Sequence, residues 1–306
     1  MNETWDCVIA GGGAAGLSAA LVLGRARRRT LVVDTGAPSN AVSHGIGGLL
    51  GHDGRPPADL YADGRSELTR YPNVEVRTGE VVDARDGELF DVRLGDGSAV
   101  AARRLLLATG MDYRLPDLPG LADLWGDAVF HCPFCHGWEM REAPLAVLAD
   151  GARAVHAALM LRGWTDDIVL LTDSLDGDEA ALVQAAGIVV DPRRPSQVRA
   201  ARGGVEIEFD DGTVLPRRGL MAAPVLRQRS PLAQRLGVRL DAANPMSADA
   251  VWVDAFGRTS LRGVFAAGDV TVQLPQVAAA IAAGSKTAAA VVQSLLADEY
   301  GLPVPA

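Results

Sequence analysis

Two of the three cysteines in this 306-residue chain, Cys132 and Cys135, form a C-x-x-C pair with His131 and His136 on either side. Thiols at this spacing can close a small disulfide ring, and a neighbouring imidazole can promote formation of the thiolate that takes part in exchange. A structural zinc site needs four Cys or His ligands, and no second C-x-x-C or H-x-x-x-H pattern follows in the sequence. The spacing therefore predicts a redox-active pair of cysteines and no metal site.

Each of these histidines is a candidate proton acceptor for a substrate thiol. An imidazole has an ordinary pKa near ~6.5, so it exchanges protons readily at neutral pH. We expect at least one of His131 and His136 to act in this way, with His131 slightly preferred. The alternatives are a hydrogen-bonded turn residue for either histidine and two space-filling thiols for the cysteine pair. Cys7 lies in an apolar run and is predicted to be a core residue.

Composition and charge narrow the class of protein. The chain is 48% hydrophobic and 22% charged, which is typical of a globular protein, and its length suits two domains. The formal net charge of −9 gives no field attractive to a phosphate backbone, so no nucleic-acid partner is expected. The first residues lack the basic region of a signal peptide.

No membrane association is expected either. Gly284, Ser285 and Lys286 interrupt the Ala-rich run at 277–292, so no window reaches the ~20 apolar residues that a bilayer span needs. We therefore expect a cytoplasmic protein. In a reducing cytosol a C-x-x-C pair is more often catalytic than structural.

A glycine-rich turn near the N-terminus predicts a dinucleotide site. Gly11, Gly13 and Gly16 complete the pattern G-x-G-x-x-G between an apolar run and a helical pattern, and a second apolar run ends at Asp34. Gly11 permits a tight turn, Gly13 lets the backbone approach a pyrophosphate, and Gly16 allows the helix to pack closely on the sheet. Asp34 is placed to accept hydrogen bonds from ribose hydroxyls. The alternative is a glycine-rich turn without a ligand, and the register of strand, helix and acid argues against it.

A second β-α-β pattern lacks the features that bind phosphate. Its strand, helix and strand are predicted at 145–149, 154–161 and 167–172. Ala149 stands where the first glycine belongs, and the Asp150 carboxylate would repel a phosphate. The acidic run at 173–179 contains no Arg or Lys to hold a 2′-phosphate. This pattern predicts a nucleotide-binding fold whose NADPH site is degenerate.

Two further strand-and-turn segments are widely separated in the sequence. Residues 105–110 form a strand that ends in a turn of small residues, and residues 263–270 repeat this form before a helix at 276–296. If these two turns lie in the same domain as the first glycine-rich turn, that domain is discontinuous in the sequence. The other domain is then inserted between residues near 112 and 242, where proline and glycine mark the links.

These motifs, in this order, resemble the low-molecular-weight thioredoxin reductase family over nearly the whole chain. The resemblance implies an α/β fold with two Rossmann-like dinucleotide-binding domains. The FAD-binding domain would be discontinuous, at 1–112 and 243–306, and the NADPH-type domain at 113–242 would carry the disulfide. It also implies a homodimer.

The same resemblance assigns cofactor-binding residues by the match of motifs. The ADP half of FAD would be held by Gly11, Gly13, Ala14, Ala15, Gly16 and Asp34. The ribityl chain would be held by Gly268 and Asp269, and the edge of the isoalloxazine by Gln276, Val277 and Ala278. Ala108, Thr109, Gly110 and Asn40 would complete the cofactor site.

The sequence also departs from the family, and the departures favour a different reaction. Thioredoxin reductases place Asp after the second cysteine, whereas His136 follows Cys135 here. C-x-x-C-H-G resembles the branch of the dithiol oxidases of gliotoxin and holomycin, which oxidise a substrate dithiol and pass the electrons through FAD to oxygen. His131 also matches a position proposed in that branch for base chemistry.

The sequence therefore predicts an FAD-dependent dithiol oxidase that acts on a small-molecule dithiol, with O2 as the acceptor and H2O2 as the second product. Two alternatives stay open. One is a thioredoxin reductase-like enzyme that uses NAD(P)H or another electron donor, and the other is a non-catalytic flavoprotein that senses redox state.

Overall fold

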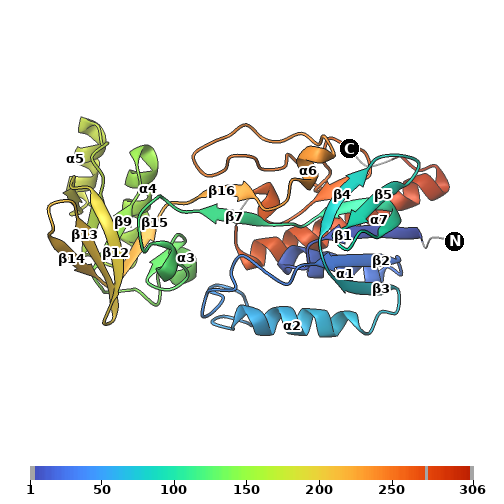
Figure 1. The fold of residues 1–306 in the computed structure, drawn as a ribbon, viewed down its shortest axis with the longest axis horizontal. Coiled ribbons are helices and arrows are strands. Elements are labelled where there is room, and N and C mark those ends of the chain that lie inside the picture. The colour runs from blue at the N-terminus through green and yellow to red at the C-terminus, as the bar shows by residue number, and fades with distance from the viewer. Residues whose placement is uncertain (1–3, 273–274, 304–306) are drawn as a thin grey trace. The chain divides into compact units, whose positions relative to one another are not determined.

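The computed structural model describes residues 4–272 and 275–303, which form two compact units (Figure 1). The first unit is built from three stretches of chain, Met1–Ala41, Pro56–Asp112 and Leu226–Ala306. The second unit is built from Val42–Arg55 and Tyr113–Val225. The glycine-rich turn at residues 11–16 belongs to the first unit, and the C-x-x-C pair belongs to the second.

The first unit contains a seven-stranded sheet in the order β3-β2-β1-β6-β5-β4, with β17 paired to β6. Its strands are β1 (Thr4–Ala10), β2 (Thr30–Asp34), β3 (Val74–Thr78), β4 (Val81–Arg85), β5 (Phe90–Leu94), β6 (Ala99–Leu107) and β17 (Val264–Ala266). β3, β2, β1, β6 and β17 run parallel, whereas β4 and β5 form an antiparallel extension on β6. The central strands read as continuous apolar runs because both faces of this part of the sheet are covered.

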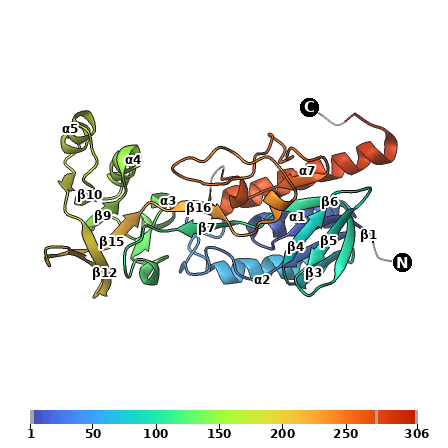
Figure 2. The same cartoon turned by 45° about the horizontal axis from the view of Figure 1, so that its top comes forward.

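Helices cover one face of that sheet. α1 (Ala14–Arg25), α2 (Pro57–Leu68) and α7 (Val277–Tyr300) share a core with inward residues of β1, β2 and β6, among them Cys7, which is fully buried. α7 runs along α1 (Figures 1 and 2), and the Ser18 hydroxyl donates to the Ile281 carbonyl at 2.8 Å. The other face packs against the β4–β5 extension and the segment that contains α6 (Leu232–Arg235).

α7 is long and apolar enough to cross a membrane by length and composition, with a mean hydropathy of 1.3. Small residues on one side of this helix pack against α1, however, and Val291 and Leu295 are fully buried in the core. This packing is that of a core helix.

The second unit is a parallel sheet in the order β11-β10-β9-β15-β8. Its strands are β8 (Val129–Phe130), β9 (Leu145–Leu148), β10 (Ile168–Leu171), β11 (Val189–Asp191) and β15 (Gly219–Ala222). α4 (Gly151–Leu161) and α5 (Gly177–Ala185) cover one face. An antiparallel sheet of β12 (Pro195–Ala201), β13 (Gly204–Phe209) and β14 (Val214–Arg217) covers the other. Alternate residues of β9 face the two cores, as the period of a strand requires.

The links between the units differ from the boundaries that the sequence suggested. β7 (Met111–Arg114) and β16 (Val225–Gln228) pair as a two-stranded sheet that carries the chain out and back. The chain therefore returns to the first unit at Leu226, well before the predicted residue 243. The predicted second link, near residue 242, is followed by a turn inside the first unit, where Ser247 and Asn244 bond each other through their backbones.

Candidate functional site

The turn after β1 forms a cradle at the N-terminus of α1. Gly11 has φ of +107°, and a Cβ on it would lie 2.2 Å from the Ala108 carbonyl oxygen. A Cβ on Gly16 would lie 1.9 Å from the Gly11 carbonyl oxygen, so α1 could not approach the turn with any larger residue there. Gly13 is different, because a Cβ on it would meet nothing within 4 Å. The open side of the turn therefore lies at Gly13, the residue predicted to face a pyrophosphate.

The α1 N-terminus has the charge and the free donors that an anion needs. Gly13 is the N-cap residue, no acidic residue lies in the first turn, and the Leu17 N–H is bonded to the Gly13 carbonyl at 2.9 Å. The N–H groups of Ala14, Ala15 and Gly16 have no carbonyl four residues earlier within the helix. Together with the helix dipole they favour a phosphate at this position. These residues fit the diphosphate of FAD.

Asp34 supports the cradle from the end of β2. Its Oδ1 accepts a hydrogen bond from the Gly12 N–H at 3.0 Å, which ties the turn to the second strand. The sequence predicted that this carboxylate accepts from ribose hydroxyls, and its Oδ2 would have to serve that role.

Gly268 brings the C-terminal part of the chain to the same cradle. A Cβ on Gly268 would lie 2.8 Å from the Ala15 Cβ and 3.9 Å from the Ala280 Cβ. Asp269 opens the short 3-10 helix Asp269–Thr271 directly after it. Gln276 is the N-cap of α7, so Val277 and Ala278 supply a second helix N-terminus to the first unit. The Ala108 N–H donates to Ala10 at 2.8 Å and begins the turn Ala108-Thr109-Gly110. The structure thus brings together predicted residues from three distant parts of the chain.

Tyr61 is a residue of this site that the sequence analysis missed. It lies on α2, is 6% exposed, and donates its hydroxyl to Oδ1 of Asn40 at 3.0 Å. Burial raises the pKa of the Tyr61 phenol, the hydrogen bond to Asn40 lowers it, and the carboxylates of Asp269 and Asp34 raise it further. Tyr61 therefore lies within electrostatic reach of two predicted cofactor residues. A single tyrosine in this part of the sequence gave no signal for this role.

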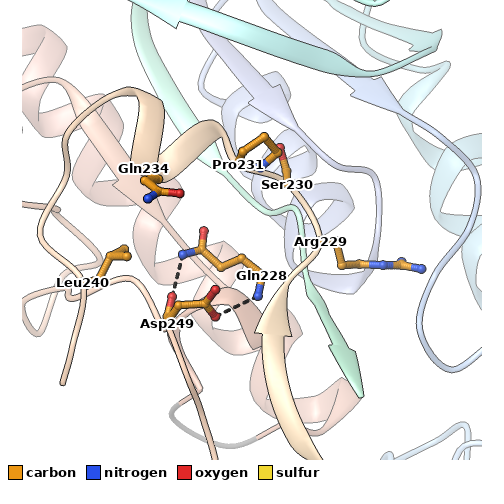
Figure 3. Close-up of a pocket in the computed structure, with 7 residues that line it drawn as sticks. All are labelled: Gln228, Arg229, Ser230, Pro231, Gln234, Leu240 and Asp249. Atoms are coloured by element: carbon orange, nitrogen blue, oxygen red, sulfur yellow. Dashed lines mark hydrogen bonds between the residues drawn. The ribbon is translucent and has the colours of Figure 1, made fainter. Parts of the chain in front are cut away.

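A separate pocket of about 300 Å3 in the first unit contains none of the predicted residues (Figure 3). Asp249 anchors it, since its Oδ1 accepts from the Gln228 N–H at 2.9 Å and its carbonyl accepts from the Gln228 side chain. Arg229 points away from this pair (Figure 3) and donates to Asp112 at 3.0 Å, next to the link between the units.

The cysteine pair lies at the start of α3 (Pro133–His136) in the second unit. Cys132 is the N-cap residue, and its carbonyl accepts from the N–H groups of Cys135 and His136, each at 3.1 Å. This tight turn keeps both cysteines on one short element. Cys132 is buried at 9% exposure, whereas Cys135 is half-buried.

The two histidines have unlike surroundings. The His131 ring stacks on Trp125 with centroids 5.4 Å apart and contacts Tyr113 at 4.8 Å. The His136 ring stacks on Phe130 at 5.7 Å. Nε2 of His131 and Nδ1 of His136 are buried, and neither has a hydrogen-bond partner within residues 4–272 and 275–303. Each histidine therefore keeps one ring nitrogen that a ligand could bond.

The expectation that the imidazole titrates near neutral pH is wrong for His131 in this structure. Burial, followed by the charges of His136 and Arg153, lowers the pKa of His131 from 6.5 to about 4. Burial also lowers the pKa of His136, although Glu139, the backbone carbonyls of Cys132 and Gly126, and Asp127 oppose that shift. The His131 ring is therefore neutral at pH 7 in the folded protein, and burial favours the neutral form of His136 as well.

The buried His131 predicts that stability falls with acidification. The unfolded chain takes up a proton near pH 6.5 and the folded protein only near pH 4, so the free energy of unfolding falls as the pH drops through this window. We expect a loss of about 2 kcal/mol between pH 7 and pH 5. Urea unfolding at the two pH values measures this change in the free energy of unfolding. His131→Phe should remove most of this loss, and His156→Ala, on an exposed position of α4, should not. An unchanged pH dependence in His131→Phe would contradict this origin.

The α4 N-terminus in the second unit differs from that of α1. The Gly151 N–H donates to the Ser174 hydroxyl at 3.2 Å, and the Thr172 hydroxyl bonds Asp150 at 3.5 Å and Ser174 at 3.0 Å. Asp150 is the N-cap residue. Arg153, in the first turn, donates to the Pro224 carbonyl at 3.0 Å. The start of α4 thus differs from that of α1, because a carboxylate is its N-cap residue and one of its first N–H groups is bonded to a side chain.

Trp138 is exposed, at 66%, and Arg141 lies over its ring at 4.0 Å. Phe134, between the two cysteines, is 61% exposed and contacts Trp164 edge-on. Neither aromatic side chain is a core residue. The neighbourhood of the cysteine pair therefore presents apolar surface to solvent in the described chain.

Residues 5–284 match the pyridine nucleotide-disulphide oxidoreductase family. The thioredoxin reductase tcpT of Claviceps purpurea is 32% identical over 311 residues, which cover 97% of this chain and 96% of that protein. An oxidoreductase of Agrobacterium tumefaciens has a TM-score of 0.91 and 36% identity, over 96% of this chain and 99% of its own. The structure of HlmI also has a TM-score of 0.91 and 36% identity, over 97% of this chain and 94% of its own.

The chain belongs to the pyridine nucleotide-disulphide oxidoreductase family. It is a flavin-dependent thiol/disulfide oxidoreductase of the thioredoxin reductase-like type, and its cofactor is FAD. The predicted fold class and the predicted family are confirmed. When bound, FAD supplies a two-electron acceptor for the thiol chemistry of the second unit.

Proposed function

We propose that this protein is an FAD-dependent dithiol oxidase. It closes a disulfide in a small-molecule dithiol through Cys132 and Cys135, with O2 as the final acceptor and H2O2 as the second product. The observation that carries this proposal is the α4 N-terminus. A reductase that uses NAD(P)H has to load its flavin from that nucleotide, and Asp150, Thr172 and Ser174, which lie where its phosphate would bind, are engaged with one another.

Three features of the second nucleotide position support the proposal. Asp150 occupies the N-cap, the Ser174 hydroxyl accepts from the Gly151 N–H, and the next turn is the acidic run at 173–179. Anions are favoured at a helix N-terminus only where the N–H groups and the positive end of the dipole are available to them. Here the Gly151 N–H already has a partner, and the Asp150 carboxylate lies at the positive end of the dipole, where it opposes a phosphate by like charge.

In the proposed reaction a substrate thiolate attacks the Cys132 sulfur of the Cys132–Cys135 disulfide. The bond between the two cysteine sulfurs breaks, and Cys135 leaves as a thiolate. The second substrate thiol then attacks the substrate sulfur of the mixed disulfide, which releases Cys132 and gives the cyclic disulfide product. Two electrons and two protons leave the substrate, and the electrons stay on the cysteine pair until the cofactor accepts them.

His136 is the better candidate for the base, although the sequence slightly favoured His131. A thiol has a pKa near ~8.5, so its proton would move to a base with a pKa of about 4 at a cost of roughly 6 kcal/mol. Burial lowers the pKa of His136 as well, but the Glu139 and Asp127 carboxylates and two backbone carbonyls oppose that shift. His131 would then hold the substrate through its Nε2 atom.

Anaerobic titration of the purified holoprotein tests the function. We expect micromolar NADPH and NADH to bleach the flavin absorbance slowly and without saturation, and a small dithiol such as dithiothreitol to bleach it rapidly. Admission of air should then restore the absorbance with one H2O2 per dithiol. Rapid saturable bleaching by NADPH would instead establish the reductase.

The reductase is the second candidate, because the relative tcpT carries the name thioredoxin reductase. We also propose that the protein works as a cytoplasmic homodimer. Sedimentation of the holoprotein at micromolar concentration tests the dimer.

A further inference from the structure

A glycine-rich segment, Val42–Arg55, lies with the second unit although the chain on both sides of it belongs to the first. β2 precedes it and α2 follows it. In the structure it packs on the turn that carries the cysteine pair, and the reaction proposed above gives it no role.

The segment is closed by its own hydrogen bonds. The Ile46 N–H donates to the Arg55 carbonyl at 2.9 Å, and the Gly54 N–H donates to the Ile46 carbonyl at 2.8 Å. Between these ends, the Gly48 N–H donates to the Asp53 carboxylate at 2.8 Å. Ile46 is 5% exposed and anchors the loop. The segment is therefore a preformed loop with a fixed shape.

The loop approaches the dithiol turn closely at Gly47. A Cβ on Gly47 would lie 2.6 Å from the Cys135 carbonyl oxygen and 3.1 Å from its Cα. Carbon–oxygen contacts lie at ~3.3–3.6 Å, so any side chain at this position would push the loop and α3 apart by more than half an ångström. Gly47 has no positive φ, and close approach to Cys135 is what requires a glycine here.

A second contact reaches the surroundings of His136. A Cβ on Gly126 would lie 2.6 Å from a Val42 methyl group, and Nε2 of His44 lies 3.7 Å from Oδ1 of Asp127. The Gly126 carbonyl and the Asp127 carboxylate both act on His136. The loop thus contacts the backbone of the second cysteine and two of the residues that act on the neighbouring histidine.

We propose that the segment Val42–Arg55 is a positioning element of the dithiol centre, with Gly47 as its positioning residue for Cys135. The loop fixes where the Cys135 sulfur lies, and its contacts with Gly126 and Asp127 fix the surroundings of His136. This role in turnover rests on the proposed dithiol oxidase activity. A displacement of reacting groups by about 1 Å can cost up to a hundredfold in rate.

Gly47→Ala in the holoprotein tests the proposal. We expect the kcat of dithiol oxidation to fall about tenfold or more with a KM changed less than about threefold, because the reacting sulfur is displaced while substrate binding is kept. In the reduced protein, iodoacetamide should alkylate Cys135 at least about threefold faster, as α3 separates from the loop. FAD content should stay at the wild-type level. Gly177→Ala is the control, since a Cβ there meets nothing within 4 Å.

Wild-type values of both kcat and Cys135 alkylation in Gly47→Ala would overturn the proposal. Should the wild-type protein fail to oxidise dithiols, the proposed function falls and the alkylation of Cys135 alone decides the role of the loop. If Gly47→Ala does not fold, the double variant Val42→Ala, His44→Ala removes contacts without adding bulk. It should shift the pH profile of Cys135 alkylation by about half a unit or more, and an unchanged profile would overturn the proposal.

Discussion

Replacing Cys132 or Cys135 with serine is expected to abolish dithiol-dependent oxygen consumption. The loss should be on the order of a thousandfold or more, because a hydroxyl neither forms the enzyme disulfide nor accepts the electron pair. An oxygen electrode with dithiothreitol as substrate measures the rate. Both variants should keep stoichiometric FAD, since the cysteines lie in the second unit and the cradle in the first.

Cys7→Ala is the matched control for this pair. Cys7 is fully buried, and burial raises the pKa of its thiol, so it is inert in exchange. The variant should keep the wild-type rate. If both serine variants oxidise dithiothreitol at the wild-type rate, the cysteine pair takes no part in the reaction and the proposed mechanism is wrong.

The two serine variants should differ in how they react with a small disulfide such as cystamine. We expect a mixed disulfide to form faster on Cys132 of Cys135→Ser than on Cys135 of Cys132→Ser, because Cys132 is the sulfur proposed to meet substrate. Intact mass shows the adduct. Cys135 is the more exposed sulfur in this structure. Faster labelling of Cys135 would therefore exchange the roles of the two cysteines while keeping the disulfide mechanism.

Gly13→Asp is expected to remove FAD from the protein. Its carboxylate would compete with the diphosphate for the N–H groups at the start of α1 and repel it by like charge. The fold should be kept, because a Cβ on Gly13 meets nothing within 4 Å and Asp is a favourable N-cap residue. We expect less than about a tenth of the wild-type flavin absorbance per chain, with unchanged far-ultraviolet circular dichroism.

Gly177→Asp provides the control for the added charge. Gly177 is the first residue of α5, also has open space at its Cβ position, and lies in the second unit. This variant should purify with a full complement of FAD. Stoichiometric flavin in Gly13→Asp would show that the diphosphate lies elsewhere.

The cradle around α1 could be predicted from the sequence because its determinants are local. The tight turn, the close packing of α1 and the free N–H groups all follow from Gly11, Gly13 and Gly16 between a strand and a helix. The dithiol turn is equally local, since four consecutive residues hold both thiols. The carboxylate at the start of α4 could also be predicted, as Asp150 directly precedes that helix in the chain.

Only the tertiary structure decided the properties that depend on distant packing. His131 is as close to Cys132 in sequence as His136 is to Cys135, and burial against Trp125 and Tyr113 is what lowers the pKa of His131 to about 4. Desolvation depends on all the groups that surround a side chain in the folded protein, and a local sequence pattern does not specify those groups. Tyr61 likewise joins the cofactor site through the approach of α2 to Asn40.

The sequence by itself determined the chemical groups of this protein and the turns that present them. It determined neither the return of the chain at Leu226 nor the packing of Gly47 on Cys135. Hydrogen bonds within a turn form between residues a few positions apart, so neighbouring residues in the sequence determine them. Contacts between segments separated by about ninety residues follow from how whole elements bury their surfaces, and that packing is set by the complete fold.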